Sequence, residues 1–262
     1  MSWERTIGRV SFINCEPLFH GLDDSWDVLP APPSWLTGHL LRKDCILAPI
    51  PAAAYAKNCS ELLLVPDLAI SSRGEVGSVL LFGSVPIESM NTIALPSDSA
   101  SSVALLRHLV SKRGLTPDYL EMGPDLDGML DSCDGCLLIG DRALEGARAH
   151  PELVIMDLGA EWLEVTGNPM VFGVFAARRD SNVDLIRSAY DALITRLGAF
   201  EEDSEVRKQV IAVSGEKSSQ SPERLERYFG EVINRMDSKD MDGLRIFLKT
   251  ACGMDEEPIM AW

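Results

Sequence analysis

The sequence predicts an α/β protein of two lobes with a helical C-terminal portion. Short apolar runs alternate with helical stretches as far as Asp180, and only helical stretches follow, which is typical of an α/β core with added helices. A length of 262 residues, 46% of them hydrophobic, favours two modest cores over one large core. No repeat of solenoid period interrupts this order.

The N-terminal part alternates apolar runs with short helical turns. The run at 45–50, Cys-Ile-Leu-Ala-Pro-Ile, is continuously apolar, as in a parallel strand covered on both faces. Pro17 suits the first turn of a helix, and Ser34 suits the cap of the next helix. We expect strands at 8–12, 26–29, 45–50, 62–65 and 74–82, and helices at 17–22, 34–41 and 52–56.

A strand, a hydroxyl-rich loop and a helix follow one another at residues 91–114. The apolar run 93–95 ends at Pro96, and apolar residues then recur at helical spacing until Gly114. Free N–H groups and the positive dipole end of such a helix favour a bound carboxylate or phosphate. The same residues also fit a helix cap in a solvated turn. The polar residues of this loop are Ser97, Asp98, Ser99, Ser101 and Ser102.

The pattern of buried strand, glycine, polar residue and helix recurs at 136–144, where Asp141 follows Gly140. Asp141 either faces a ligand at the sheet edge or caps the next helix. The remaining expected strands are 119–122, 154–158 and 170–177, and the remaining expected helices are 125–130, 160–166, 182–200, 206–213, 222–236 and 241–252.

Two more polar residues stand where strands and loops meet. Asn14 follows the first strand, at the sheet edge where ligands gather in open α/β proteins, although a turn asparagine bonded to its own backbone explains it equally well. Ser78 follows Gly77 at the start of a long strand, where glycine suits close approach by a ligand or a β-bulge.

Charge and composition exclude several classes of protein. A net charge of −16 argues against nucleic acid and anionic membranes as partners. No apolar run reaches the roughly 20 residues that span a bilayer, and the first residues do not resemble a secretory signal, so we expect a cytoplasmic protein with reduced cysteines. Because salt screens charges over roughly 8 Å, donors inside a cleft can still hold an anion.

Most catalytic motifs are absent from the chain. Cys133 and Cys136 have the spacing of a zinc pair, but no second Cys or His cluster accompanies them, so we interpret them as small residues entering a buried strand. The four histidines do not cluster, and dinucleotide, Walker-type and serine-hydrolase motifs are missing. What remains is a set of hydroxyls, an amide and helix ends suited to a small carboxylate.

Five separated segments carry a family resemblance. Residues 11–18 (SFINCEPL), 76–79 (VGSV), 97–103 (SDSASSV), 138–141 (LIGD) and 157–162 (DLGAEW) resemble, in order and spacing, the menaquinone-biosynthesis chorismate dehydratases of the futalosine pathway, the MqnA family. The likeness runs from about Arg9 to Asp180.

This resemblance implies a two-lobed fold like the type II periplasmic binding proteins, with mixed sheets in each lobe and the substrate cleft between them. Lobe 1 would comprise residues 1–87 and 173–262, and lobe 2 residues 88–172, with crossings near 82–88 and 167–175. The implied activity converts chorismate, a dicarboxylate, to 3-[(1-carboxyvinyl)oxy]benzoate and water as the first step of the futalosine route, without cofactor or metal. No oligomeric state is implied.

The resemblance also implies roles for residues. Asn14 matches the asparagine beside the reacting ring. The family pattern has an arginine at the place of Ala100 and a threonine at that of Ser101, and loss of a guanidinium near a dianion would weaken binding unless that arginine is structural. The residues implied to hold substrate are Ser78, Ser99, Ser101, Ser102, Gly140 and Asp141.

Two other functions fit the same sequence features. The related 1,4-dihydroxy-6-naphthoate synthase has a similar fold but uses a histidine base, and no histidine stands in a matching loop here. A non-catalytic binding protein for an aromatic carboxylate needs much the same cleft. Because the motifs contain no histidine base, we expect that in a dehydratase a carboxylate of the substrate itself takes the ring proton.

Overall fold

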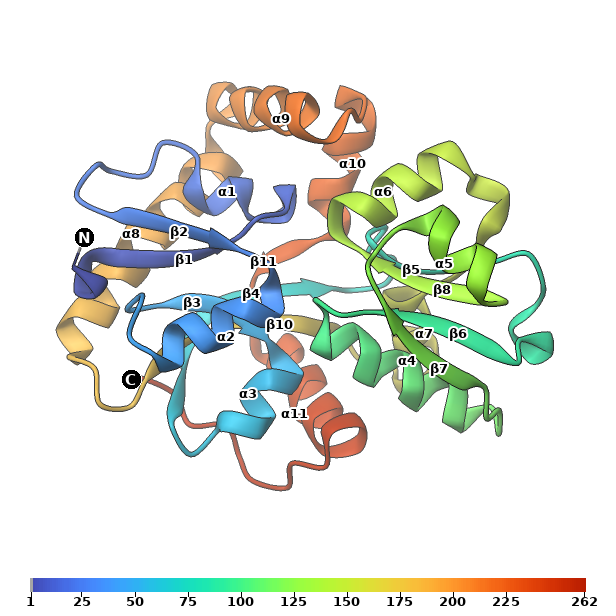
Figure 1. The fold of residues 1–262 in the computed structure, drawn as a ribbon. Coiled ribbons are helices and arrows are strands. Elements are labelled where there is room, and N and C mark those ends of the chain that lie inside the picture. Colours follow the sequence, from blue (N-terminus) through green and yellow to red (C-terminus); the bar gives the residue numbers. More distant parts are fainter. Residues whose placement is uncertain (1) are drawn as a thin grey trace.

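The structure is a computed structural model that describes residues 2–262. Two β-sheets lie side by side, each flanked by helices, and both chain ends lie on the side of the first sheet (Figure 1). The four-stranded sheet has the order β11-β4-β10-β3, and the five-stranded sheet has the order β7-β6-β8-β5-β9. The predicted α/β class with a helical C-terminal portion is confirmed.

The first sheet is built around a long antiparallel pair, β4 and β10. A parallel pair, β1 and β2, continues this sheet, because the Gly8 N–H donates to the Leu47 carbonyl oxygen over 2.8 Å. The strands on this side are β1 (Thr6–Val10), β2 (Asp27–Ala31), β3 (Ala48–Pro51), β4 (Leu62–Ser72), β10 (Met170–Arg178) and β11 (Ile233–Arg235).

The second sheet is mixed. Strand β6 runs parallel to β7 and β8, whereas β5 runs antiparallel to β8 and β9. Parallel neighbours need a crossover connection, which α4 and the helices after it supply. The strands are β5 (Val79–Gly83), β6 (Thr92–Pro96), β7 (Asp118–Met122), β8 (Gly135–Ile139) and β9 (Val154–Asp157).

Helices cover both sheets, and among the described residues none has the length and hydropathy for a bilayer crossing. Helices α3 and α11 pack on β10. The α-helices are α1 (Glu16–Phe19), α2 (Pro33–Leu41), α3 (Ala52–Asn58), α4 (Ala100–Lys112), α5 (Leu126–Ser132), α6 (Gly140–Ala149), α7 (Leu158–Thr166), α8 (Val183–Glu202), α9 (Ser204–Ser218), α10 (Pro222–Glu231) and α11 (Ser238–Cys252). Short 3₁₀ turns are η1 (Trp3–Arg5), η2 (Ile13–Cys15), η3 (Ile87–Ser89) and η4 (Pro151–Leu153).

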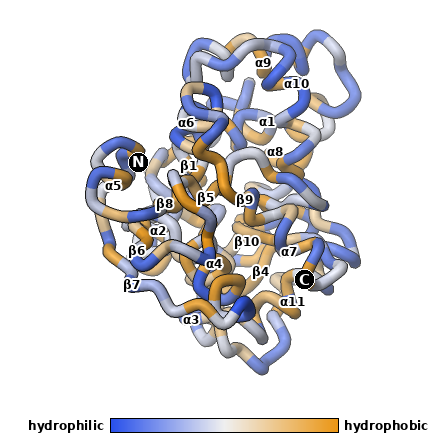
Figure 2. Tube along the Cα trace, turned by 90° about the vertical axis from the view of Figure 1, so that its right-hand side faces the viewer, coloured by the Kyte–Doolittle hydropathy of each residue, from blue (hydrophilic) through white to orange (hydrophobic). Residues whose placement is uncertain are grey.

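The core follows from the apolar runs of the strands. Every residue of β8 is buried, and in β10 only Arg178 is not. Apolar colour concentrates along the strands and hydrophilic colour on the outer turns (Figure 2). Trp162 of α7 is fully buried, packs edge-on against Phe247 of α11, and donates its indole N–H to the Pro169 carbonyl oxygen over 3.1 Å. The apolar surface removed from water is the main term that stabilises this arrangement.

Strand pairing differs from the sequence-based boundaries. The expectation placed residues 79–83 in lobe 1, but β5 pairs with β8 and β9 of the second sheet. An apolar run reveals that a strand is buried without revealing its partner. We propose that the chain crosses between the sheets after Ser72 and returns before Met170, so that lobe 2 begins at about Val79.

Two other elements also depart from expectation. Strand β3 is buried as expected, but it pairs antiparallel with β10. The helix expected over 222–236 ends at Glu231, and β11 then pairs with β4. The β-branched pair Val232 and Ile233 disfavours helix continuation, and Asn234 donates its side-chain amide to the Ala69 carbonyl oxygen over 3.4 Å.

The first crossing between the sheets is held by one carboxylate, Asp157, at the start of α7. It accepts the N–H groups of Val76 and Gly77, the latter over 2.7 Å. It also accepts the first N–H groups of its own helix, from Gly159 and Ala160, over 2.9 and 3.0 Å. One side chain therefore joins the crossing segment to a helix N-terminus.

Asp157→Ala should lower the free energy of unfolding by about 2–3 kcal/mol, because four backbone donors lose their acceptor. Urea denaturation at pH 7 measures the change. Asp203→Ala is the matched control, since Asp203 caps α9 without touching a crossing segment, and it should cost about 1 kcal/mol. An equal loss of stability in both variants would contradict the role of Asp157 in joining the crossing segment to α7.

Candidate functional site

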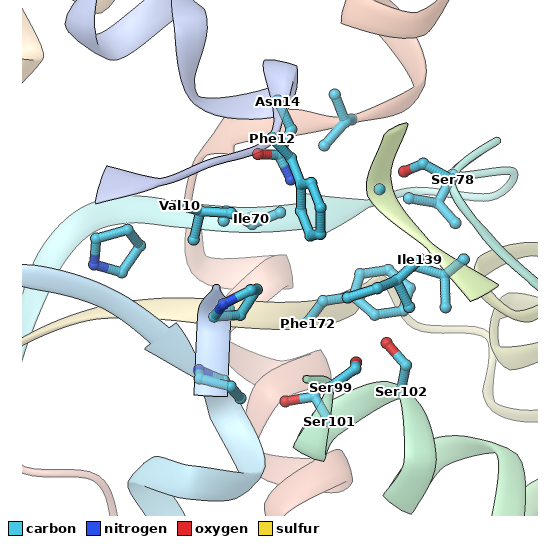
Figure 3. A pocket seen from close by; sticks show the side chains of 18 of the residues that line it. Val10, Phe12, Asn14, Ile70, Ser78, Ser99, Ser101, Ser102, Ile139 and Phe172 are labelled. Atoms are coloured by element: carbon cyan, nitrogen blue, oxygen red, sulfur yellow. The ribbon is translucent and has the colours of Figure 1, made fainter. Parts of the chain in front are cut away.

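A cavity of about 60 Å³ lies between the two sheets. Phe12, Ile139 and Phe172 form part of its apolar wall (Figure 3). Its polar side chains are those of Asn14, Ser78, Ser99, Ser101 and Ser102.

The cavity brings together six of the seven residues that the sequence singles out. Gly140 joins the five polar residues in the lining, whereas Asp141 is not part of it. The six come from segments on both sheets, so the long-range arrangement places them together. Their roles toward a ligand stay predictions.

The serines stand where α4 begins. Ser99 occupies the N-cap position, but its side chain makes no capping hydrogen bond, so helix capping does not explain this serine. The first intrahelical bond runs from the Val103 N–H to the Ser99 carbonyl oxygen, so the N–H groups of residues 100–102 have no partner within the helix. The Ser101 hydroxyl oxygen accepts the Ala53 N–H over 3.1 Å, which leaves its proton free to donate. This end of the cavity offers hydrogen-bond donors to an anion.

Asn14 lies on the opposite side of the cavity from these serines (Figure 3). Its side chain is 7% exposed, and its amide oxygen Oδ1 is buried without a hydrogen-bond partner. An asparagine that stabilises a turn would accept a backbone N–H through that oxygen, so a role in the turn does not explain Asn14. A buried polar atom without a partner costs free energy, and the Asn14 side chain is one of those that line the cavity.

Ser78 is oriented by a residue that sequence reasoning missed. Tyr228 of α10 is fully buried and donates its hydroxyl to the Ser78 Oγ over 3.1 Å. Burial raises the pKa of Tyr228 far above its usual value, so the phenol stays protonated and acts as the donor. The Ser78 proton is then free for a ligand. In the sequence, Tyr228 is indistinguishable from a core residue on the apolar face of an amphipathic helix.

Gly140 has a steric reason to be glycine. Its φ is +60°, and a Cβ there would lie 2.6 Å from the Phe12 ring. Glycine therefore allows the start of α6 to pack directly on the aromatic wall of the cavity.

Asp141 neither lines the cavity nor caps its helix. The N-cap of α6 is Ile139, and the Asp141 Oδ1 instead accepts the Ile13 N–H over 3.1 Å. Burial raises the pKa of Asp141 to about 6, although the Ile13 N–H and the neighbouring Arg142 lower it. Asp141 therefore contacts the segment that carries Asn14, and its expected contact with substrate stays a prediction.

No titratable side chain lines the cavity among the described residues. The nearby guanidinium of Arg142 stands 5.8 Å from the Phe12 ring centroid and is paired with Asp98 over 2.7 Å. Within residues 2–262, no three His, Cys, Asp or Glu side chains gather as a metal site would require. Hydroxyls, an amide and helix ends are thus the polar groups that meet a ligand here.

Two sheets with a cavity between them are typical of the class of periplasmic-binding-protein-like folds. A crystal structure of an Archaeoglobus fulgidus protein matches with a TM-score of 0.76, covering 94% of this chain and 96% of that chain at 19% identity. The alkanesulfonate-binding protein of Xanthomonas axonopodis pv. citri, bound to MOPS, matches with a TM-score of 0.62, covering 98% and 95% at 13% identity. The fold implied by the family resemblance is confirmed.

The chain belongs to the menaquinone biosynthesis family, whose model matches residues 5–252. It is 30% identical over 271 residues to the chorismate dehydratase of Thermus thermophilus, covering 97% of this chain and 97% of that protein.

Gly140→Ala should destabilise the protein by about 2–4 kcal/mol, because left-handed backbone strain and the overlap with Phe12 add together. Gly167→Ala is the matched control: Gly167 has φ +70°, and a Cβ there meets nothing within 4 Å. That variant should lose only about 1–2 kcal/mol. Thermal or urea unfolding compares the two, and equal losses would show that the Phe12 contact yields at no cost.

Proposed function

We propose that this protein is a chorismate dehydratase that converts chorismate to 3-[(1-carboxyvinyl)oxy]benzoate and water in menaquinone biosynthesis, as the first step of the futalosine route. The observation that carries the proposal is near-complete alignment with a protein of that name at 30% identity, within one family. A cytoplasmic location and a small-molecule substrate, with neither nucleic acid nor membrane as a partner, are the accompanying predictions.

The polar groups of the cavity suit a dicarboxylate with a hydroxylated ring. One carboxylate binds the hydroxyls at the start of α4 together with the unpaired N–H groups of that helix. Ser78, with Tyr228 donating to its oxygen, supplies a further donor. Phe12 and Phe172 flank the ring and exclude water from it (Figure 3).

The reaction removes a proton from the ring carbon that bears the enolpyruvyl ether and a hydroxide from the neighbouring carbon. These two leave as water, the C–H electron pair forms the new double bond, and the ring becomes aromatic. Aromatisation makes the product strongly favoured, so the protein needs only to lower the barrier.

The base in this proposal is a carboxylate of the substrate, because the lining holds no titratable side chain among the described residues. The cavity holds that carboxylate against the ring proton, and such proximity supplies roughly 7–11 kcal/mol. Asn14, whose side chain lines the cavity, orients the departing hydroxyl.

Purified protein mixed with chorismate should produce the aromatic enol ether, seen by chromatography and by its ultraviolet spectrum. Tight chorismate binding without product would contradict the proposal and favour a non-catalytic binding protein. Neither binding nor turnover would favour another activity of the same pathway, such as the dihydroxynaphthoate synthase.

Asn14→Ala should lower kcat roughly 100- to 1,000-fold, the range for loss of one polar group at the reacting centre. Steady-state kinetics with chorismate measures the change, and circular dichroism checks the fold. Asn168→Ala is the control, since Asn168 donates to the Thr166 carbonyl oxygen and lies outside the cavity lining. Turnover of Asn14→Ala near that of the parent would refute the assignment.

A further inference from the structure

Asp141 joins the two sheets beside the cavity without lining it. It is the second residue of α6, which follows β8 of the second sheet. The Ile13 N–H that it accepts belongs to η2, which follows β1 on the first-sheet side. This single hydrogen bond spans 128 residues of sequence.

The bonded segment is one turn long and carries Asn14. Ile13 opens η2, so its N–H has no acceptor within that turn. Asp141 supplies the missing acceptor, and the adjacent residues Phe12 and Gly140 pack against each other at the same point. Two consecutive residues of one side are therefore held against two of the other, and Asn14 is the next residue along the chain.

The charges around Asp141 leave it without a direct ionic partner among the described residues. Arg142, its neighbour on α6, is paired with Asp98, and Lys217 of α9 is paired with Glu16 of α1. Glu16 is also paired with Arg9 of β1. The remaining titratable groups that face Asp141 are Cys15 of η2 and Tyr228 of α10.

We propose that Asp141 is a positioning residue, whose ionised carboxylate holds η2 against α6 through the Ile13 N–H and thereby aligns Asn14 with the substrate. The kinetic part of this proposal rests on the proposed dehydratase function, whereas the structural part does not.

The protonation of Asp141 gives this contact a pH dependence. Burial raises the pKa of Asp141 to about 6, and a neutral carboxyl is a weaker acceptor than a carboxylate. Turnover should therefore fall as the pH drops through about 6. The free energy of unfolding should instead rise as the pH drops from about 6 to 4. The folded-state pKa lies above the unfolded value, so the folded chain binds the extra proton in this range.

Asp141→Asn and Asp141→Ala separate charge from hydrogen bonding. Asp141→Asn keeps an acceptor, so at pH 7.5 its kcat should stay within about 5-fold of the parent while the decline near pH 6 disappears. Asp141→Ala has no acceptor, so its kcat should fall about 10- to 100-fold with KM changed less than 3-fold, since Asp141 does not line the cavity. Glu145→Ala, at an exposed position of the same helix, is the control and should keep the parent's pH profile.

Hydrogen exchange of the Ile13 amide, followed by NMR, tests the contact without any turnover. Exchange should accelerate at least 10-fold in Asp141→Ala but not in Glu145→Ala. Unchanged Ile13 exchange in Asp141→Ala, or a decline near pH 6 that persists in Asp141→Asn, would overturn the proposal. Altered exchange in a protein inert toward chorismate would support the contact and refute the dehydratase function.

Discussion

The site depends on one constraint: the amide oxygen of Asn14 is buried without a hydrogen-bond partner among the described residues, in a side chain that lines the cavity. A folded chain tolerates such an atom when its surroundings hold it in place. The surroundings here are the short turn η2, the carboxylate of Asp141 and the ring of Phe12 on Gly140. The unpaired oxygen lowers stability locally, but the Asn14 amide is already held at the cavity wall before a ligand binds.

The second feature of the site is that its polar groups are neutral, in a protein of net charge −16. The guanidinium of Arg142 near the cavity is already paired with Asp98. Hydroxyls and helix N–H groups form directional hydrogen bonds without carrying a charge. Burial strengthens each of these hydrogen bonds by excluding water. Such a set can hold a carboxylate firmly while leaving that carboxylate basic enough to take a proton, which a bidentate arginine would oppose.

Much of this architecture could be predicted from local sequence. The strand, serine loop and helix at 91–114 follow from an apolar run, a proline stop and helical spacing, and α4 ends within two residues of the expected Gly114. Strand partners could not be predicted, because β5 and β3 are equally apolar whichever sheet or direction they join. The hydrogen bonds of Tyr228 and Asp141 could not be predicted either, because each joins segments more than 100 residues apart.

The order in which the strands of each sheet follow along the chain has a consequence for folding during synthesis on the ribosome. All strands of the second sheet lie between Val79 and Asp157, so this sheet can assemble once that stretch has emerged. The first sheet needs β10 and β11, and Leu64 also forms a parallel β-bridge with Met260. Strand β4 therefore has no partner strand until β10 and β11 have been made, and apolar strands exposed in this way favour aggregation of the nascent chain.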